Sequence, residues 1–211
     1  MNYNIKICGF KNSLLLQKNE FNGLKWVGFV FHKNSPRYVS ISKVSNILKT
    51  MSSDLIPVAV TVDQTIEEIK QYKSIGINTI QLHGSESPEY CEMLFKKYKL
   101  NLIKAISVKK EDDIFLSYDY KNYCEYILFD AKSNDTSMPG GNGISFNWNL
   151  LKDINLNFKW ILSGGLNIKN VNKAIKITKA KYLDVSSGVE DNLGNKNKAL
   201  IREFCNNAFN I

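Results

Sequence analysis

WILSGGLN, at residues 160–167, and YLDVSSGVE, at residues 182–190, are two apolar runs that each end in small residues. Each has the pattern of a buried strand followed by a bare turn. After the first turn, Ile168, Val171, Ala174 and Ile175 have the spacing of a helix face, and we expect a helix to follow the second turn in the same way. Such turns present free backbone N–H groups to one point and suit an anion. Two such turns in succession, near the end of a chain of alternating strands and helices, are typical of the phosphate site of (β/α)8 barrels.

Similar apolar runs recur along the rest of the chain. We place eight strands near residues 4–8, 25–31, 56–62, 79–83, 102–106, 126–130, 159–163 and 182–186. Strands that are continuously apolar and alternate with helical segments favour a parallel sheet. Because no break in composition divides the chain, we expect residues 1–211 to form a single domain, a (β/α)8 TIM barrel.

Two of the helical segments between these strands carry clear start signals. Thr65 and Ser87 stand where N-caps are needed for helices over 65–75 and 87–98, and Glu68 completes a capping box with Thr65. The segment 109–123 instead holds adjacent acids and several aromatic residues without a clean apolar stripe. We therefore expect the fifth helix to be short or irregular.

Composition limits the classes of function. The chain has 44% hydrophobic residues and a formal charge of +8, and Arg37 and Arg202 are its two arginines. Its lysines are spread over helix faces and are not clustered with aromatics, so we expect no nucleic-acid partner. No run is long and apolar enough for a membrane span, and the N-terminus has no secretory pattern. The four cysteines have neither disulfide-framework nor metal spacing, which indicates a reducing cytoplasm.

Reactive side chains stand at the expected carboxyl ends of the strands, where barrels carry their chemistry. These positions are Cys8, the Ser35–Arg37 segment, Asp63, His83, Asp130, Gly164–Gly165 and Ser186–Gly188. They include no His, Asp and Glu cluster at metal-ligand spacing, and no dinucleotide fingerprint follows the first strand. We therefore expect proton transfer on a small phosphorylated, carboxylate-bearing substrate, with no metal and no cofactor.

Seven segments, in order and in register from end to end, match a known family. They are KICG (6–9), GFVFHKNSPRYVS (28–40), QLHGSES (81–87), LFDAK (128–132), GGNG (140–143) with FNW after it, LSGGLN (162–167), and DVSSGVE (184–190) with GNKN (194–197). On these segments the chain resembles phosphoribosylanthranilate isomerase. The resemblance implies an Amadori rearrangement of N-(5-phosphoribosyl)anthranilate to 1-(2-carboxyphenylamino)-1-deoxyribulose 5-phosphate, in tryptophan biosynthesis.

The resemblance also implies roles for residues. The general base falls on Cys8, the general acid on Asp130 and the cation for the anthranilate on Arg37, while His83 and Asp184 match further substrate-binding positions. Phosphate contacts fall on Gly164, Gly165, Ser186, Ser187 and Gly188. We expect a lid over the substrate at Gly140, Gly141 and Gly143. The implied partner is a phosphosugar, and the chain is expected to act as a monomer or homodimer, alone or beside other enzymes of the pathway.

Physical arguments agree with the acid and the base. Asp130 ends the apolar run 126–129, where desolvation favours the neutral acid that protonates a ring oxygen. Alternation along the first strand points Lys6 and Cys8 into the barrel, and closure brings Asp184 of the last strand beside Lys6. We hypothesise that Lys6 pairs with Asp184 and favours the Cys8 thiolate.

Other interpretations of these residues stay open at this point. Cys8 fits a small apolar filler, Asp130 a helix cap, His83 a core imidazole and Arg37 a loop anchor. Asp63 stands where the family usually has asparagine, which adds negative charge at the mouth of the site. Two other functions also compete: a related sugar isomerase of histidine biosynthesis, alone or in a bifunctional form, and a barrel that only binds a sugar phosphate or a protein.

Overall fold

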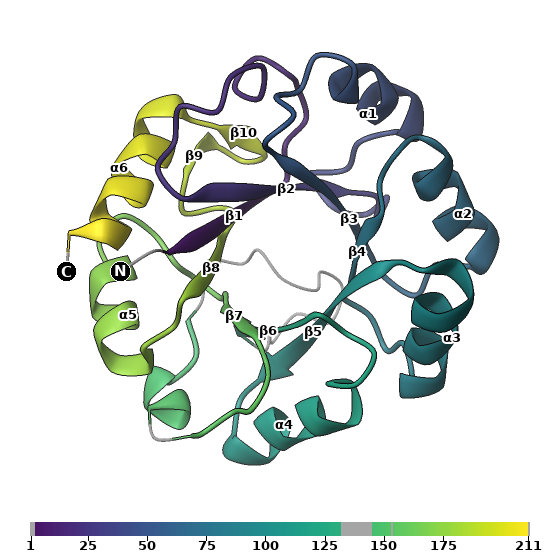
Figure 1. Ribbon diagram of the computed structural model, residues 1–211. Helices are drawn as coiled ribbons and strands as arrows, with labels where there is room; N and C mark the ends of the chain where they lie inside the picture. Colours follow the sequence, from purple (N-terminus) through teal and green to yellow (C-terminus); the bar gives the residue numbers. More distant parts are fainter. Residues whose placement is uncertain (1–2, 132–144, 153, 211) are drawn as a thin grey trace.

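The computed structural model, which describes residues 3–131, 145–152 and 154–210, has a closed barrel of eight parallel strands at its centre (Figure 1). Each strand pairs with the next, and the last strand returns to the first. The strands are β1 (Asn4–Cys8), β2 (Leu24–Val30), β3 (Ile56–Thr61), β4 (Thr79–Leu82), β5 (Asn101–Val108), β6 (Tyr126–Ala131), β7 (Trp160–Leu162) and β8 (Tyr182–Val185). All eight agree with the predicted positions, so the (β/α)8 barrel is confirmed.

Helices cover the outside of the barrel (Figure 1). They are α1 (Ile41–Leu48), α2 (Ile66–Ser74), α3 (Pro88–Tyr98), α4 (Glu111–Phe115), α5 (Val171–Thr178) and α6 (Lys198–Phe209), with the 3₁₀ turns η1 (Leu116–Asp119) and η2 (Trp148–Leu151). The capping box of Thr65 and Glu68 is present, and the Ser87 side chain accepts a hydrogen bond from the Tyr90 N–H. The segment predicted to be irregular, α4 with η1, has a five-residue helix. In the described residues no helix has the length and apolar character needed to cross a membrane.

The alternation of strands and helices is not complete. Residues 9–23, which join β1 to β2, contain turns and no helix. Gly9 and Gly23, at the two ends of this connection, both have positive φ, so the chain turns sharply where it leaves β1 and where it enters β2. After β8 the chain forms a hairpin, β9 (Glu190–Asn192) with β10 (Asn195–Lys196), before α6 begins.

Strand residues alternate between two separate cores. Ile5 and Ile7 belong to the large core between the strands and the helices, whereas Cys8 belongs to the smaller cluster inside the barrel. The predicted alternation of β1 is therefore confirmed. At the N-terminal end of the barrel, Trp26, Tyr126 and Tyr182 pack edge to face or tilted, with ring centroids 5.0 to 6.2 Å apart. These rings occupy the interior there and leave the carboxyl ends of the strands for polar groups.

Candidate active site

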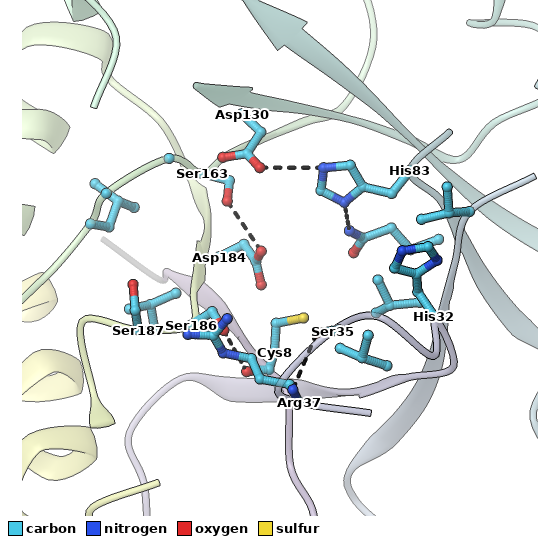
Figure 2. A pocket seen from close by; sticks show the side chains of 18 residues that line it. Cys8, His32, Ser35, Arg37, His83, Asp130, Ser163, Asp184, Ser186 and Ser187 are labelled. Carbon is cyan, nitrogen blue, oxygen red and sulfur yellow. Dashed lines mark hydrogen bonds and ion pairs between the residues drawn. The ribbon is translucent and has the colours of Figure 1, made fainter. Parts of the chain in front are cut away.

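A pocket with about 710 Å³ of open space lies at the carboxyl ends of the strands (Figure 2). Its polar lining comes from Cys8, His32, Ser35, Arg37, Gln81, His83, Asp130, Ser163, Asp184, Ser186 and Ser187. In Figure 2, Asp130 and Cys8 lie on opposite sides of this pocket, with Asp184 between them. A thiol and a carboxyl group from the first and sixth strands thus face one space.

Cys8 is the last residue of β1, and a buried ion pair lies next to it. The Lys6 Nζ is 2.8 Å from Asp184 Oδ1, and both side chains are buried. The pairing register of β1 and β8 sets Lys6 opposite Asp184, so barrel closure itself forms the pair. Ser163 Oγ donates to the other oxygen of Asp184 at 3.2 Å. The predicted Lys6–Asp184 pair is confirmed.

The charges around Cys8 do not produce a low thiol pKa. Burial raises the pKa of the Cys8 thiol above its ordinary value. Lys6, and more weakly Lys196 and Arg37, act to lower this pKa, while Asp184 adds to the rise. Lys6 therefore acts in the expected direction but does not outweigh desolvation. For Lys6 itself, burial acts to lower the pKa, but Asp184 and Cys8 outweigh burial and leave the pKa raised, so the ammonium stays charged.

Asp130 lies near the end of β6 with one oxygen held and the other facing a histidine. Asp130 Oδ1 accepts a hydrogen bond from the Ala131 N–H at 2.9 Å, and Oδ2 is 3.3 Å from His83 Nε2. Gln81 Nε2 lies 3.0 Å from His83 Nδ1. Since an amide nitrogen only donates, Nδ1 accepts, and the ring proton is on Nε2, which lies within ion-pair distance of Asp130 Oδ2 but makes no hydrogen bond in the described residues. His83 therefore places a buried N–H near the Asp130 carboxyl group without a hydrogen bond to it.

Arg37 lines the pocket from the loop after β2 and is held by a carboxylate. Its Nε and Nη2 donate to the two oxygens of Glu190 at 2.8 and 2.9 Å. Arg37 is 6% exposed, and the Glu190 side chain is also buried. Both interpretations of Arg37 thus have a structural basis, because the side chain is anchored to a loop and also faces the pocket.

The two small-residue turns also line the pocket. Gly164 and Gly165 have φ of 83° and 64°, and a Cβ on Gly164 would come within 2.6 Å of the Ala131 nitrogen. Ser186 and Ser187 stand beside them on the pocket wall. Among the described residues, the backbone N–H groups of Gly164, Gly165 and Ser187 have no hydrogen-bond partner. A concavity with free N–H groups suits an anion.

The expectation that a helix starts at each turn is corrected. No helix starts directly at either turn: α5 begins at Val171, after a turn at 167–170, and the second turn leads into the β9–β10 hairpin. The anion site consequently rests on loop N–H groups and not on helix dipoles. Gly188 is not among the residues that line the pocket and bridges to Asn167, and its predicted phosphate contact stays a prediction. The predicted lid glycines Gly140, Gly141 and Gly143 lie outside the described residues.

Several residues around the site were missed in the sequence. Glu190 and Lys196 form a buried ion pair, as do Glu86 and Lys104. The signal for Glu190 and Lys196 was their place in the matched segments DVSSGVE and GNKN, but both look like loop residues. Within the described ranges, no three His, Cys, Asp or Glu side chains are grouped to hold a metal ion.

A pocket with a thiol, a carboxyl group and unpaired N–H groups at the carboxyl ends of the strands defines the chain as a (β/α)8-barrel enzyme with an acid–base site. Residues 5–207 match the model of the N-(5'phosphoribosyl)anthranilate (PRA) isomerase family. The chain therefore belongs to the PRA isomerase family.

Individual relatives agree with this assignment. The N-(5'-phosphoribosyl)anthranilate isomerase of Rhodopseudomonas palustris is 39% identical over 202 residues, 95% of both chains. The crystal structure of phosphoribosyl anthranilate isomerase from Thermotoga maritima has a TM-score of 0.86 and 32% identity, and the match covers 99% of this chain and 100% of that one. A phosphoribosyl anthranilate isomerase solved with reduced 1-(o-carboxyphenylamino)-1-deoxyribulose 5-phosphate has a TM-score of 0.82 and 31% identity, with the same coverage.

Proposed function

We propose that this chain converts N-(5-phosphoribosyl)anthranilate to 1-(2-carboxyphenylamino)-1-deoxyribulose 5-phosphate, by general acid and general base catalysis in tryptophan biosynthesis. The observation that supports this most directly is that Cys8 and Asp130 line one pocket from opposite sides, with the two bare turns in its wall. This arrangement provides a proton donor, a proton acceptor and an anion site around one ligand.

Asp130 acts first in this proposal. Its carboxylic acid gives a proton to the furanose ring oxygen, the C1–O bond breaks, and the electron pair of the anthranilate nitrogen forms the protonated Schiff base. The carboxylate left on Asp130 is stabilised by the Ala131 N–H and by the Nε2–H of His83. His83 therefore supports the acid in the form that Asp130 takes after the transfer.

Cys8 acts second. Its thiolate removes the proton from C2 of the Schiff base, the electron pair moves toward the nitrogen, and the enolamine forms; tautomerisation then gives the ketone. Because burial raises the pKa of Cys8, the thiolate is a strong base once formed. Lys6 favours the thiolate, and Asp184 keeps Lys6 in place.

The two ends of the substrate have separate contacts in this proposal. The phosphate binds the N–H groups of the turns at Gly164–Gly165 and Ser186–Ser187, with Gly188 holding the second turn against Asn167. The anthranilate carboxylate binds Arg37. The location in a reducing cytoplasm, the monomer or homodimer state and any association with other enzymes of the pathway stay predictions.

The test is the loss of substrate fluorescence when purified protein is mixed with fresh phosphoribosylanthranilate. The wild-type chain is expected to exceed the spontaneous rate, and Cys8→Ser and Asp130→Asn are each expected to lower kcat by about 10²- to 10⁴-fold, as for proton-transfer groups. Cys205→Ala, a buried thiol in α6, and Asp191→Asn, in the exposed hairpin, are the matched controls. A wild-type rate equal to the spontaneous rate would favour the barrel that only binds.

A further inference from the structure

The β9–β10 hairpin carries two buried charged groups that neither give nor take a proton in the steps described above, although Lys196 weakly lowers the pKa of Cys8. Glu190 and Lys196 side chains are 4% and 3% exposed, and their charged atoms are 2.5 Å apart. Both project from a short hairpin between β8 and α6, in which residues 191–193 and 195 are exposed and Gly194 is buried. Burying charge on such a hairpin is costly without full hydrogen bonding, so their partners indicate their purpose.

Both carboxylate oxygens of Glu190 accept hydrogen bonds from other residues of this chain. Oε1 accepts from Arg37 Nε at 2.8 Å and from Lys196 Nζ at 2.5 Å, and Oε2 accepts from Arg37 Nη2 at 2.9 Å and the Gly194 N–H at 3.0 Å. Although burial acts against ionisation, the hydrogen bonds and charges of Arg37 and Lys196 lower the pKa of Glu190 to about 2. Glu190 is therefore a fixed carboxylate with no capacity left for a ligand.

Lys196 is satisfied in the same way. Its Nζ donates to Glu190 Oε1, to the carbonyl oxygen of Ser186 at 3.2 Å and toward Ser186 Oγ at 3.4 Å. An ammonium has three N–H groups, and three acceptors surround this one. Lys196 thus joins Glu190 to the turn at Ser186, the proposed phosphate side of the pocket.

Arg37 alone among the three keeps free donors. Its backbone N–H donates to Ser35 Oγ, and its aliphatic stem runs over Gly9, where a Cβ would come within 2.6 Å of Arg37 Cδ. Of its five guanidinium N–H groups, two donate to Glu190, and in the described part of the chain the others have no partner. Arg37 lines the pocket, and its unpaired Nη1 edge has the planar geometry that binds a carboxylate with two hydrogen bonds.

We propose that Glu190 and Lys196 are positioning residues that fix Arg37 for a carboxylate, and thereby set the selectivity of the site for a carboxylated substrate. The proposal rests on the proposed function, which supplies a substrate with a carboxylate on its aromatic ring. Glu190 orients the guanidinium and would neutralise it if it acted alone. Burial lowers the pKa of Lys196, and Glu190 acts against this change. With Lys196 protonated the net charge of the three groups is +1, so the oriented guanidinium still attracts an anion.

The test compares two substrates that differ in this carboxylate: phosphoribosylanthranilate and its analogue made from aniline. The measured quantity is the ratio of kcat/KM for the first to kcat/KM for the second. We expect Glu190→Gln and Lys196→Met to lower this ratio by about 10- to 100-fold, the range for a hydrogen-bonded charged pair, mostly through KM of the carboxylated substrate. Arg37→Met is expected to abolish the preference, and turnover of the aniline analogue by Glu190→Gln stays near wild type.

Glu20 provides a matched control, because its exposed carboxylate also pairs with one lysine and one arginine, Lys198 and Arg202. Glu20→Gln is expected to leave the ratio unchanged. If Glu190→Gln lowers kcat/KM for both substrates by the same factor, Glu190 has only a structural role and the proposal is wrong. A rise in the ratio would also overturn it, because charge alone, which Glu190→Gln increases from +1 to +2, would then govern binding.

Failure of the proposal can be told apart from failure of the proposed function. If the wild type turns over neither substrate, the function is wrong; if it prefers the carboxylated substrate and Glu190→Gln keeps that preference, only the positioning role is wrong. Should Glu190→Gln not fold, Glu190→Asp retains the charge and shortens the reach, and the same fall in the ratio is expected.

Discussion

Two lysines on the strands of the barrel are buried, each 2.8 Å from a carboxylate oxygen, but their surroundings differ. Lys104 on β5 is 2.8 Å from Glu86 Oε2, and its Nζ also donates to the carbonyl oxygens of Gly84 and Leu82. Glu86 accepts further hydrogen bonds from the N–H groups of Asp63 and Gly84. The three N–H groups of Lys104 and both carboxylate oxygens of Glu86 thus have partners, which come from the end of β4 and from the loops after β3 and β4.

The Lys6–Asp184 pair is less complete. Lys6 donates to Asp184, and its other polar neighbour is the Cys8 thiol, which raises the Lys6 pKa together with Asp184. Asp184 lines the pocket, whereas neither Glu86 nor Lys104 does. A buried ion pair whose hydrogen bonds are all made within the protein supports the fold. A pair whose remaining neighbour is a thiol can also change the pKa of that thiol.

The largest effect is expected at the saturated pair. Lys104→Met leaves the Glu86 carboxylate buried without its cation, which costs about 3–5 kcal/mol of the free energy of unfolding. Urea denaturation followed by circular dichroism measures this. Lys6→Met is expected to cost less, because Asp184 faces an open pocket; an equal loss for both variants would contradict the comparison.

A shift in thiol titration is expected at the other pair. Because the positive charge of Lys6 acts to lower the Cys8 pKa, Lys6→Met raises that pKa further. A rise of about one unit leaves about tenfold less thiolate below the pKa, so the ascending limb of kcat/KM moves to higher pH. Alkylation of Cys8 with iodoacetamide across pH, followed by mass spectrometry, measures it. Lys25→Met is the control, and an unchanged Cys8 pKa would remove Lys6 from the mechanism.

The smallest effect is expected at Asp63, whose N–H and side chain join the saturated network. Asp63 has φ of 49°, and its Oδ1 accepts from the Ser85 N–H at 2.7 Å. Asn tolerates this backbone region and keeps the acceptor, so Asp63→Asn changes the free energy of unfolding by about 0.5 kcal/mol or less. Removing one negative charge near the mouth should lower KM for the anionic substrate by about twofold at low salt, an effect that salt screens. A rise in KM for Asp63→Asn would show that the Asp63 charge does not repel the substrate.

Much of the barrel was predictable because its strands are continuous apolar runs and their order fixes their neighbours. The Lys6–Asp184 pair followed from two simple rules, alternation along a strand and closure of the first strand on the last. Lys104 stands in a similar apolar strand, but its partner Glu86 is in a polar loop, and the sequence does not show that this loop folds inward. The same holds for Glu190 and Lys196, since charges in a hairpin look solvated until their partners are known.

The helix starts predicted at the two small-residue turns came from the local sequence pattern. These predictions were wrong for a similar reason. Val171, Ala174 and Ile175 do form the buried face of α5, but Asn167 is tied to Asn170 and delays the helix start. After Ser187, the chain is committed to the hairpin by contacts of Glu190 with Arg37, 153 positions away. Contacts over such a distance in sequence are not visible in local periodicity.

The closure of β8 on β1 has a consequence for biosynthesis. A ribosome makes Asp184 178 positions after its partner Lys6. Until then Lys6 has no Asp184 to pair with, and the turn at Ser186, which contacts Cys8, has not been made. A polypeptide that stops before β8 therefore lacks the partner of Lys6 and the Ser186–Ser187 turn, and the hairpin that holds Arg37 follows only after that strand.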